Sequence, residues 1–261
     1  MPDGTKPFTQ ELQDLLSVSV EQIENYYNEF ERLSVWRLLP EIGSNSRRTD
    51  HSDKTLDIAE AFSFYCVLRH LKATSIIELG TRFGVSSALL HATLVENMKE
   101  IPKSRRNATL IGCDLVREFQ YIDEQAKYFT FNCGDAHNLF PSILETRQFD
   151  CLFNDAHPYT LIKKSTESAI ENKVRVLAFH DVGKKHRRSS FNRESYFLSE
   201  EEKIKNNLNL KDYGYWERHV MAEIFGERIL DEDSLETVDH KVQIFDSLFG
   251  LGIAVRKEFL L

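Results

Sequence analysis

The sequence predicts an α/β fold, a mainly parallel sheet with helices on both faces. From residue 74 to about 180, short apolar runs alternate with helical segments, which is typical of repeated βα units. Two further short strands, joined by a turn at 247–250, then close the chain as an antiparallel hairpin. Five of the apolar runs end in an acidic residue: Glu78, Asp114, Asp135, Asp155 and Asp181. Because ligands of such sheets bind outside the carboxyl ends of the strands, these acids indicate a candidate site.

The bulk composition is that of a water-soluble globular protein. The chain has 261 residues, of which 41% are hydrophobic, and its net charge of −8 argues against indiscriminate binding of nucleic acid. Its 4 cysteines contain no CxxC pair, so we expect small buried core residues rather than disulfides or zinc ligands. No apolar run resembles a signal peptide or a membrane span. These features predict a cytoplasmic protein that does not bind membranes.

The N-terminal part is predicted to be helical. Apolar residues recur at three- and four-residue steps over 9–39, and candidate caps at Thr9 and at Ser17 or Ser19 divide this stretch into two helices. A polar loop covers 40–54, and an amphipathic helix follows over 55–71. We therefore expect a helical N-terminal cap or extension over 1–55 and an α/β domain over 56–261.

The stretch 74–87 is predicted to be a strand, a glycine turn and the start of a helix. The strand ends at Glu78, Gly80 and Gly84 follow, and the helix covers 85–99. Glycine tolerates positive φ and lets the backbone approach a ligand, and a helix start offers unpaired N–H groups. Such a turn usually holds a nucleotide-like ligand.

The remaining elements follow from the same periodicities. We expect strands at 110–113, 128–133, 149–153, 174–179, 240–245 and 251–256, and helices at 117–127, 138–147, 159–171 and 215–228. The long polar segment 182–212 is predicted to be a lid or binding loop. Its basic run 184–188 fits a solvated loop, a patch that attracts an anionic substrate, or a nucleic-acid contact, which the acidic net charge disfavours.

The order of these motifs resembles the class I S-adenosylmethionine-dependent methyltransferases. The run 78–84, Glu-Leu-Gly-Thr-Arg-Phe-Gly, is similar to their first motif, Asp114 follows the second strand, and Gly-Asp-Ala at 134–136 follows the third. The closing hairpin is similar to the sixth and seventh strands of the family. The resemblance implies a Rossmann-like sheet of seven strands in the order 3-2-1-4-5-7-6, with the last strand antiparallel.

By resemblance, S-adenosylmethionine lies over the strand-end loops. The residues implied to bind it are Glu78, Gly80, Thr81, Arg82, Phe83, Gly84, Ser86, Asp114, Leu115, Gly134, Asp135, Ala136 and Asp155. Asp114 suits the ribose hydroxyls, and Asp135 suits the adenine amino group. Either aspartate alone could instead be a helix N-cap.

The runs 153–159 and 178–182 resemble the small-molecule O-methyltransferase branch, which includes macrocin- and catechol-type enzymes. This branch implies Asp155, Asp181 and His180 as ligands of Mg²⁺ or another divalent cation, and His157 as a general base. Asp155 and His180 are expected, together with His157, to be catalytic residues. The sequence departs from the usual pattern, because Asp-Ala-His at 155–157 is one residue shorter than Asp-Gly-x-His. His157 could thus be a surface or N-cap residue, and His180 a histidine bonded to backbone.

The expected activity is methylation of a hydroxyl on a small molecule, such as a sugar, a phenol or a natural product. The sequence does not decide whether this acceptor is anionic or whether the protein forms a homo-oligomer. An alternative is a non-catalytic protein of the same fold that binds the cofactor or serves as a scaffold. Methylation of nucleic acid or protein is less favoured, since the sequence lacks the Asn/Asp-Pro-Pro-Tyr motif.

Overall fold

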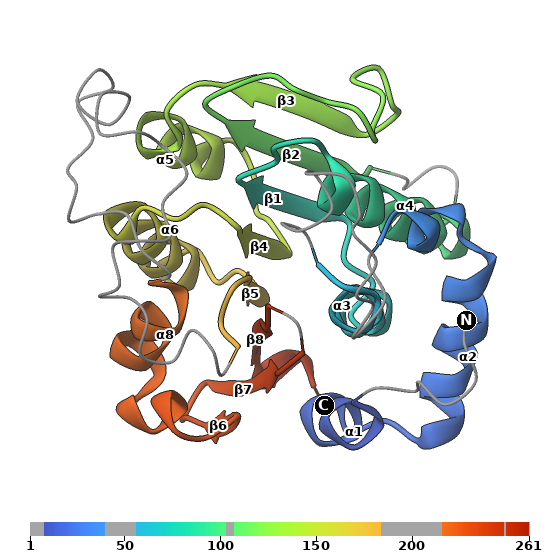
Figure 1. Ribbon diagram of the computed structural model, residues 1–261, viewed down its shortest axis with the longest axis vertical. Coiled ribbons are helices and arrows are strands. Elements are labelled where there is room, and N and C mark those ends of the chain that lie inside the picture. The colour runs from blue at the N-terminus through green and yellow to red at the C-terminus, as the bar shows by residue number, and fades with distance from the viewer. Residues whose placement is uncertain (1–7, 40–55, 103–106, 184–215, 248, 261) are drawn as a thin grey trace, which may run out of the picture.

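The computed structural model describes residues 8–39, 56–102, 107–183, 216–247 and 249–260 (Figure 1). Its centre is one sheet in the order β3-β2-β1-β4-β5-β8-β7-β6. The strands are β1 (Ser75–Leu79), β2 (Thr109–Asp114), β3 (Phe129–Cys133), β4 (Cys151–Asn154), β5 (Val176–Phe179), β6 (Ser234–Glu236), β7 (His240–Phe245) and β8 (Leu251–Arg256). Strands β1 to β5 are parallel, and β8 is antiparallel to β5. The predicted parallel sheet with an antiparallel ending is confirmed.

Within the described residues the sheet has eight strands, so the expected seven is wrong. The additional strand is β6, which pairs antiparallel with β7 at the outer edge. Ser234 and Glu236 are exposed and Leu235 is half-buried, so this strand of 3 residues has a single apolar position, which is too few for a pattern that the sequence could reveal.

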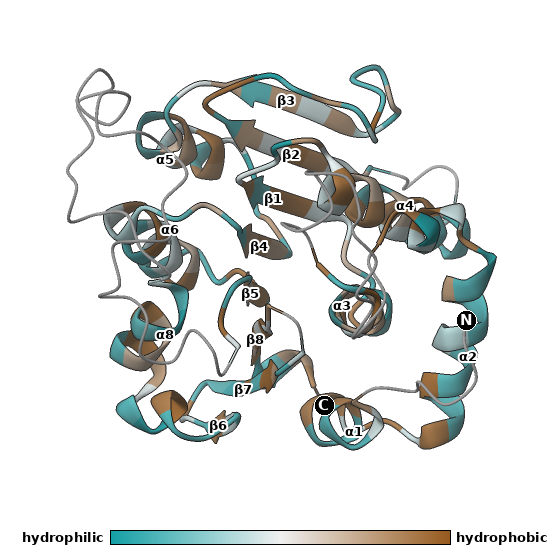
Figure 2. Ribbon diagram, viewed as in Figure 1, coloured by the Kyte–Doolittle hydropathy of each residue, from teal (hydrophilic) through white to brown (hydrophobic). Residues whose placement is uncertain are grey.

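Helices cover both faces of the sheet (Figure 1). They are α1 (Thr9–Leu16), α2 (Val20–Arg32), α3 (Ile58–His70), α4 (Val85–Glu100), α5 (Ala136–Thr146), α6 (Tyr159–Glu171) and α8 (Glu217–Phe225), with the 3₁₀ turns η1 (Ser34–Leu38), η8 (Glu227–Leu230) and η9 (Lys257–Phe259). One core lies between the sheet and α1 to α4, and the other lies between the sheet and α5, α6 and α8. Alternate strand residues, such as Ile76 and Ile77, belong to opposite cores, and Figure 2 shows that β1, β2 and β4 are mainly apolar.

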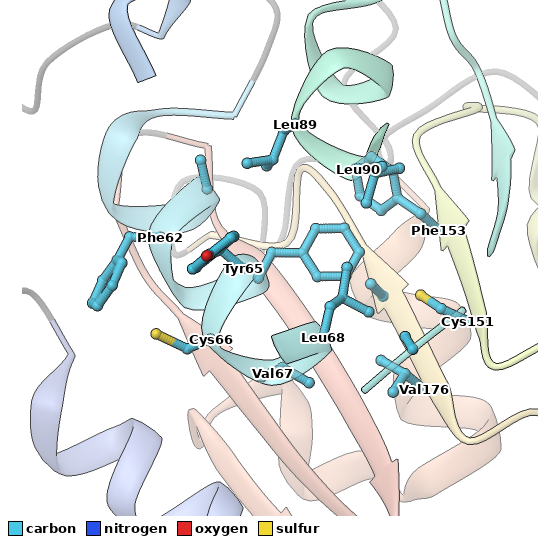
Figure 3. Close-up of a cluster of buried hydrophobic side chains, with 14 of the residues drawn as sticks. Phe62, Tyr65, Cys66, Val67, Leu68, Leu89, Leu90, Cys151, Phe153 and Val176 are labelled. Carbon is cyan, nitrogen blue, oxygen red and sulfur yellow. The ribbon is translucent and has the colours of Figure 1, made fainter. Parts of the chain in front are cut away.

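Helix α3 is buried on all sides, which differs from the amphipathic helix expected over 55–71. Every residue from Ile58 to Arg69 is buried, and the helix packs against the sheet residues Cys151, Phe153 and Val176 (Figure 3). Its outer side is covered by α2, because Phe30 contacts both Phe62 and Tyr65. A helix that is covered on all sides by protein has no face left for solvent.

The two predicted N-terminal helices are confirmed. Ser19 caps α2, its side chain accepting a hydrogen bond from the Gln22 N–H. Helix α1 contacts the far end of the sheet, where Phe8 lies 5.4 Å from Phe245 between ring centroids and Lys241 donates to the Asp14 carbonyl. The first helices are thus joined to both α3 and β7.

The helix expected over 117–127 is absent from the structure, which has turns there. The N–H groups of Gln120 and Tyr121 donate to the carbonyl of Phe83 in the glycine turn, and the ring of Phe119 packs edge-on to Phe131. These tertiary contacts take the place of helical hydrogen bonds.

The four cysteines are free, as expected, but Cys133 is exposed while the other three are buried. The predicted loops at 40–54 and 182–212 lie outside the described residues, apart from 182 and 183. Across the described ranges, we find no helix with the length and apolar character needed to cross a membrane.

Candidate active site

The acids that end the parallel strands meet at one edge of the sheet. Glu78 is in β1, which lies between β2 and β4, and β5 lies next to β4. Asp114 ends β2, Asp155 follows β4, and Asp181 follows β5 by two residues. The candidate site predicted at the carboxyl edge therefore exists as a group of neighbouring residues.

The glycine turn between β1 and α4 has the predicted geometry. Gly80 has φ +91° and Gly84, the N-cap of α4, has φ +82°. A Cβ added to Gly80 would lie 2.4 Å from the carbonyl oxygen of Asp155, and one on Gly84 would lie 2.7 Å from a side-chain carbon of Ile122. Gly80 is thus closely packed against the residue that follows β4, and the positive φ at both positions favours glycine.

Glu78 is completely buried beneath this turn. One carboxylate oxygen, Oε2, accepts a hydrogen bond from the Ser87 hydroxyl at 2.5 Å. Within the described part of the chain, neither Glu78 Oε1 nor the buried hydroxyl of Thr81 has a hydrogen-bond partner. Burial raises the pKa of Glu78 to about 8, although the hydroxyls of Ser86 and Ser87 oppose the shift.

Asp114 links the end of β2 to the same turn. Its Oδ2 accepts from the Arg82 N–H at 2.7 Å, and its Oδ1 accepts from the Val116 N–H at 3.3 Å. Burial raises the pKa of Asp114, while these backbone donors oppose the shift. Leu115, the next residue, is 56% exposed and so can contact a ligand at the surface of this edge.

Asp135 lies at the end of the outer strand β3 and is the N-cap of α5. Its side chain accepts from the His137 N–H at 2.9 Å, and it follows Gly134, which has φ +151°. Ala136 is the first residue of α5. The helix-cap reading of Asp135 is therefore confirmed, and its contact with adenine stays a prediction.

Asp155, His180 and Asp181 come together as the sequence predicts. One ligand atom from each residue lies within 4.8 Å of the other two. His180 Nδ1 is 2.9 Å from Asp155 Oδ1 and 3.8 Å from Asp181 Oδ2. Asp181 has φ +58°, which is strained for a residue with a side chain. The three residues could hold a divalent cation.

His180 is buried, and its second nitrogen faces Glu60. His180 Nε2 lies 3.7 Å from Glu60 Oε2, beyond hydrogen-bond distance. Burial lowers the pKa of His180, but the negative charges of Asp155 and Asp181 outweigh it and hold that pKa well above its usual range.

His157 contacts a second glutamate. Its Nδ1 is 3.1 Å from Glu217 Oε1 and 4.0 Å from Asp181 Oδ2. Burial lowers the pKa of His157, but the hydrogen bond and charge of Glu217 and the charge of Asp181 raise it to about 9. These neighbours favour the protonated ring, whereas a general base has to be uncharged when it takes a proton.

Glu60 and Glu217 were not predicted as site residues. The sequence contains a pattern that could have drawn attention to Glu60, because Asp57-x-x-Glu60 forms a capping box at the start of α3. Glu217 has no such pattern, since it is one charged residue after a polar segment and only folding brings it to His157.

Comparisons with known proteins give weak similarities. No protein-family model and no curated protein sequence matches the chain. Among solved structures, the O-methyltransferase TomG of Streptomyces achromogenes, involved in tomaymycin synthesis and crystallised with S-adenosylmethionine (SAM), is 16% identical over 95% of each chain, with a TM-score of 0.49. An O-methyltransferase of Bacillus cereus in complex with S-adenosylhomocysteine (SAH) is 14% identical over 95% of this chain and 96% of that one, with a TM-score of 0.46. MycE of the mycinamycin biosynthetic pathway, in complex with Mg and SAH, is 11% identical over 73% of this chain and 46% of that one, with a TM-score of 0.42.

Similarities of this size leave the function to be argued from the residues of the chain itself.

Proposed function

We propose that this protein is an S-adenosylmethionine-dependent methyltransferase that methylates a hydroxyl group of a small molecule. One observation carries the proposal: the glycine turn at Gly80 packs directly on Asp155. A turn suited to the methyl donor and a cluster suited to deprotonating a hydroxyl are thereby adjacent at one edge of the sheet.

The turn fits the methyl donor. Glu78 Oε1 and Thr81 Oγ1 are buried acceptors that, within the described ranges, have no partner, and a ligand with amino and hydroxyl groups would satisfy them. Asp114, held by the Arg82 N–H, can accept from two ribose hydroxyls. The negative charge of Asp155, and that of Glu78 once it gives up its proton, favour a ligand that carries ammonium and sulfonium groups. The methyl group on that sulfonium is the electrophile that S-adenosylmethionine supplies.

The cluster fits a divalent cation. Asp155 and Asp181 offer carboxylate oxygens, which Mg²⁺ prefers, and His180 offers an imidazole nitrogen that other divalent metals accept. A cation held there lowers the pKa of a hydroxyl bound beside it.

His157 is the candidate general base. Since Nδ1 faces Glu217, Nε2 is the nitrogen that would take the proton of the acceptor hydroxyl. The charges of Asp181 and Asp155 contribute to the raised pKa of His157. A cation bound by these two carboxylates would offset their charges and bring the pKa of the imidazole toward the range in which it acts as a base near neutral pH. The turn and the cluster would then hold the donor and the hydroxyl in line, which is the main requirement of methyl transfer.

The other parts of the proposal concern organisation. Residues 1–55 would form the helical cap and 56–261 the cofactor-binding domain, and four free cysteines agree with a cytoplasmic location. The acidic lining of the site favours a neutral acceptor over an anionic one. The basic run 184–188, which could favour an anionic acceptor, lies outside the described residues.

Calorimetry with SAM and SAH tests whether the protein binds the cofactor, which both an enzyme and a non-catalytic binding protein would do. We expect both ligands to bind, and binding of neither would refute the proposal. Turnover with a panel of sugars and phenols then separates the two, because a non-catalytic protein binds the cofactor without releasing SAH.

A further inference from the structure

Glu217 is a buried acid outside the set that ends the strands. It lies in the first turn of α8 with no exposed surface. Its Oε1 is 3.1 Å from His157 Nδ1, and its Oε2 has no hydrogen-bond partner in the part of the chain that the structure describes. We propose that Glu217 is a positioning residue, whose carboxylate accepts a hydrogen bond from the Nδ1–H of His157 and so makes Nε2 the nitrogen that accepts the substrate proton.

The inference rests on the proposed function and adds a residue to it. Neutral imidazole carries one proton on either ring nitrogen, and the hydrogen bond made by one nitrogen decides the state of the other. A carboxylate at Nδ1 therefore sets the ring's orientation and its tautomer together, as outer partners of functional histidines do.

The burial of Glu217 supports this role. Removing a carboxylate from water is costly unless it is paired, and the partner given by the structure is His157. Helix α8 does not require the acid for docking, because Val220, Met221 and Phe225 of the same helix are buried in the second core.

The position of Glu217 is fixed by its neighbour. Arg218 is completely buried, and its guanidinium donates to the carbonyl of Val182 at 2.7 Å and to that of Ile229 at 2.8 Å. Val182 directly follows Asp181, so the first turn of α8 is tied to the strand end that carries the candidate cation ligands. Glu217 is thereby held at a defined distance from His157.

Two variants separate the charge from the hydrogen bond. Glu217→Gln keeps an acceptor of the same shape, and Glu217→Leu removes it. We expect kcat to fall by about 10–100-fold in Glu217→Leu and by less in Glu217→Gln, with KM for SAM unchanged. Glu223→Gln is the control, since Glu223 is in the same helix but pairs with Lys163 at the surface, and it should keep the kcat of the parent protein. A thermal midpoint measured for each variant shows whether folding is intact.

A second measurement does not depend on turnover. The ¹⁵N chemical shifts of the His157 ring, recorded at a pH where the ring is neutral, show which nitrogen carries the proton. We expect that proton on Nδ1 in the parent protein and a shift toward the Nε2-protonated tautomer in Glu217→Leu. An Nδ1 signal that is the same in both proteins would overturn the pairing. In a chain that methylates its acceptor, an unchanged kcat in Glu217→Leu would overturn the positioning role. Failure to bind SAM would instead refute the proposed function. The ¹⁵N spectra would then still decide whether Glu217 pairs with His157.

Discussion

Glu60 Oε2 lies 3.7 Å from His180 Nε2, which places a buried carboxylate of α3 directly behind the histidine that contacts Asp155. The other oxygen of Glu60 accepts hydrogen bonds from the Ser247 hydroxyl and from the Gly250 N–H. One side chain thus connects the start of α3, the turn before β8 and the candidate cation cluster. Burial raises the pKa of Glu60, but His180 and the hydrogen bonds it accepts outweigh burial and lower that pKa.

We expect Glu60→Gln to destabilise the protein by about 2–3 kcal/mol, because the amide group turns one acceptor into a donor that faces buried N–H groups. The thermal midpoint should fall by about 4–12 °C for a chain of this length. Glu232→Gln is the control, since it breaks only a surface pair with Arg228 and should leave the midpoint unchanged. Equal midpoints for Glu60→Gln and the parent protein would contradict the connecting role.

The raised pKa of Glu78 predicts an effect of pH on stability. The folded chain keeps the proton of this carboxyl up to about pH 8, whereas the unfolded chain releases it near the ordinary value of about 4.3. The folded state thus binds more protons between these values, so its stability falls as pH rises through this window. We expect Glu78→Gln to flatten that fall in urea titrations at pH 5 to 9. Parallel curves for the two proteins would show that Glu78 does not titrate there.

Glu78 also predicts how SAM affinity depends on pH. A cationic ligand favours the ionised carboxylate, so binding below pH 8 should release a proton and weaken as pH falls. Calorimetry in buffers of different ionisation enthalpy measures that release directly. In Glu78→Gln we expect it to be smaller, and an identical release would assign it to another group.

Gly80→Ala tests the turn. The added methyl would meet the carbonyl of Asp155, and φ +91° is costly for alanine, by about 1–2 kcal/mol before the clash. We expect SAM binding to be lost while far-UV circular dichroism stays that of a folded protein. Gly226→Ala is the matched control, because Gly226 also has a positive φ, +132°, but lies at the end of α8, where Leu235 is the one described residue near its Cβ position. It should lose stability and keep SAM binding.

Asp181→Asn tests the candidate cation site. We expect calorimetry to show Mg²⁺ binding to the parent protein and a loss of at least about tenfold in affinity in the variant, because a charged oxygen ligand is removed. Activity should then be sensitive to EDTA and be restored by Mg²⁺. Full turnover after chelation would refute a role for a metal.

Much of the fold is readable from local patterns. The apolar runs, the Gly80–Gly84 spacing and the acids at the strand ends predict the parallel strands, the turn and the edge that carries the site, because each depends on residues close together in the chain. Asp155, His180 and Asp181 could be grouped from sequence for a second reason, which is that parallel neighbouring strands bring their carboxyl ends together.

Other features depend on contacts between distant segments, which no local pattern encodes. The turns at 117–127 are joined to Phe83 by the N–H groups of Gln120 and Tyr121, and β6 is held by its pairing with β7. Glu60 and Glu217 reach the histidines from α3 and α8, which are far from the strand ends in sequence. The sequence by itself thus determined the class of fold and the edge where the site lies. The tertiary structure alone decided which buried carboxylates contact His180 and His157, because burial and pairing arise only when separate elements pack together.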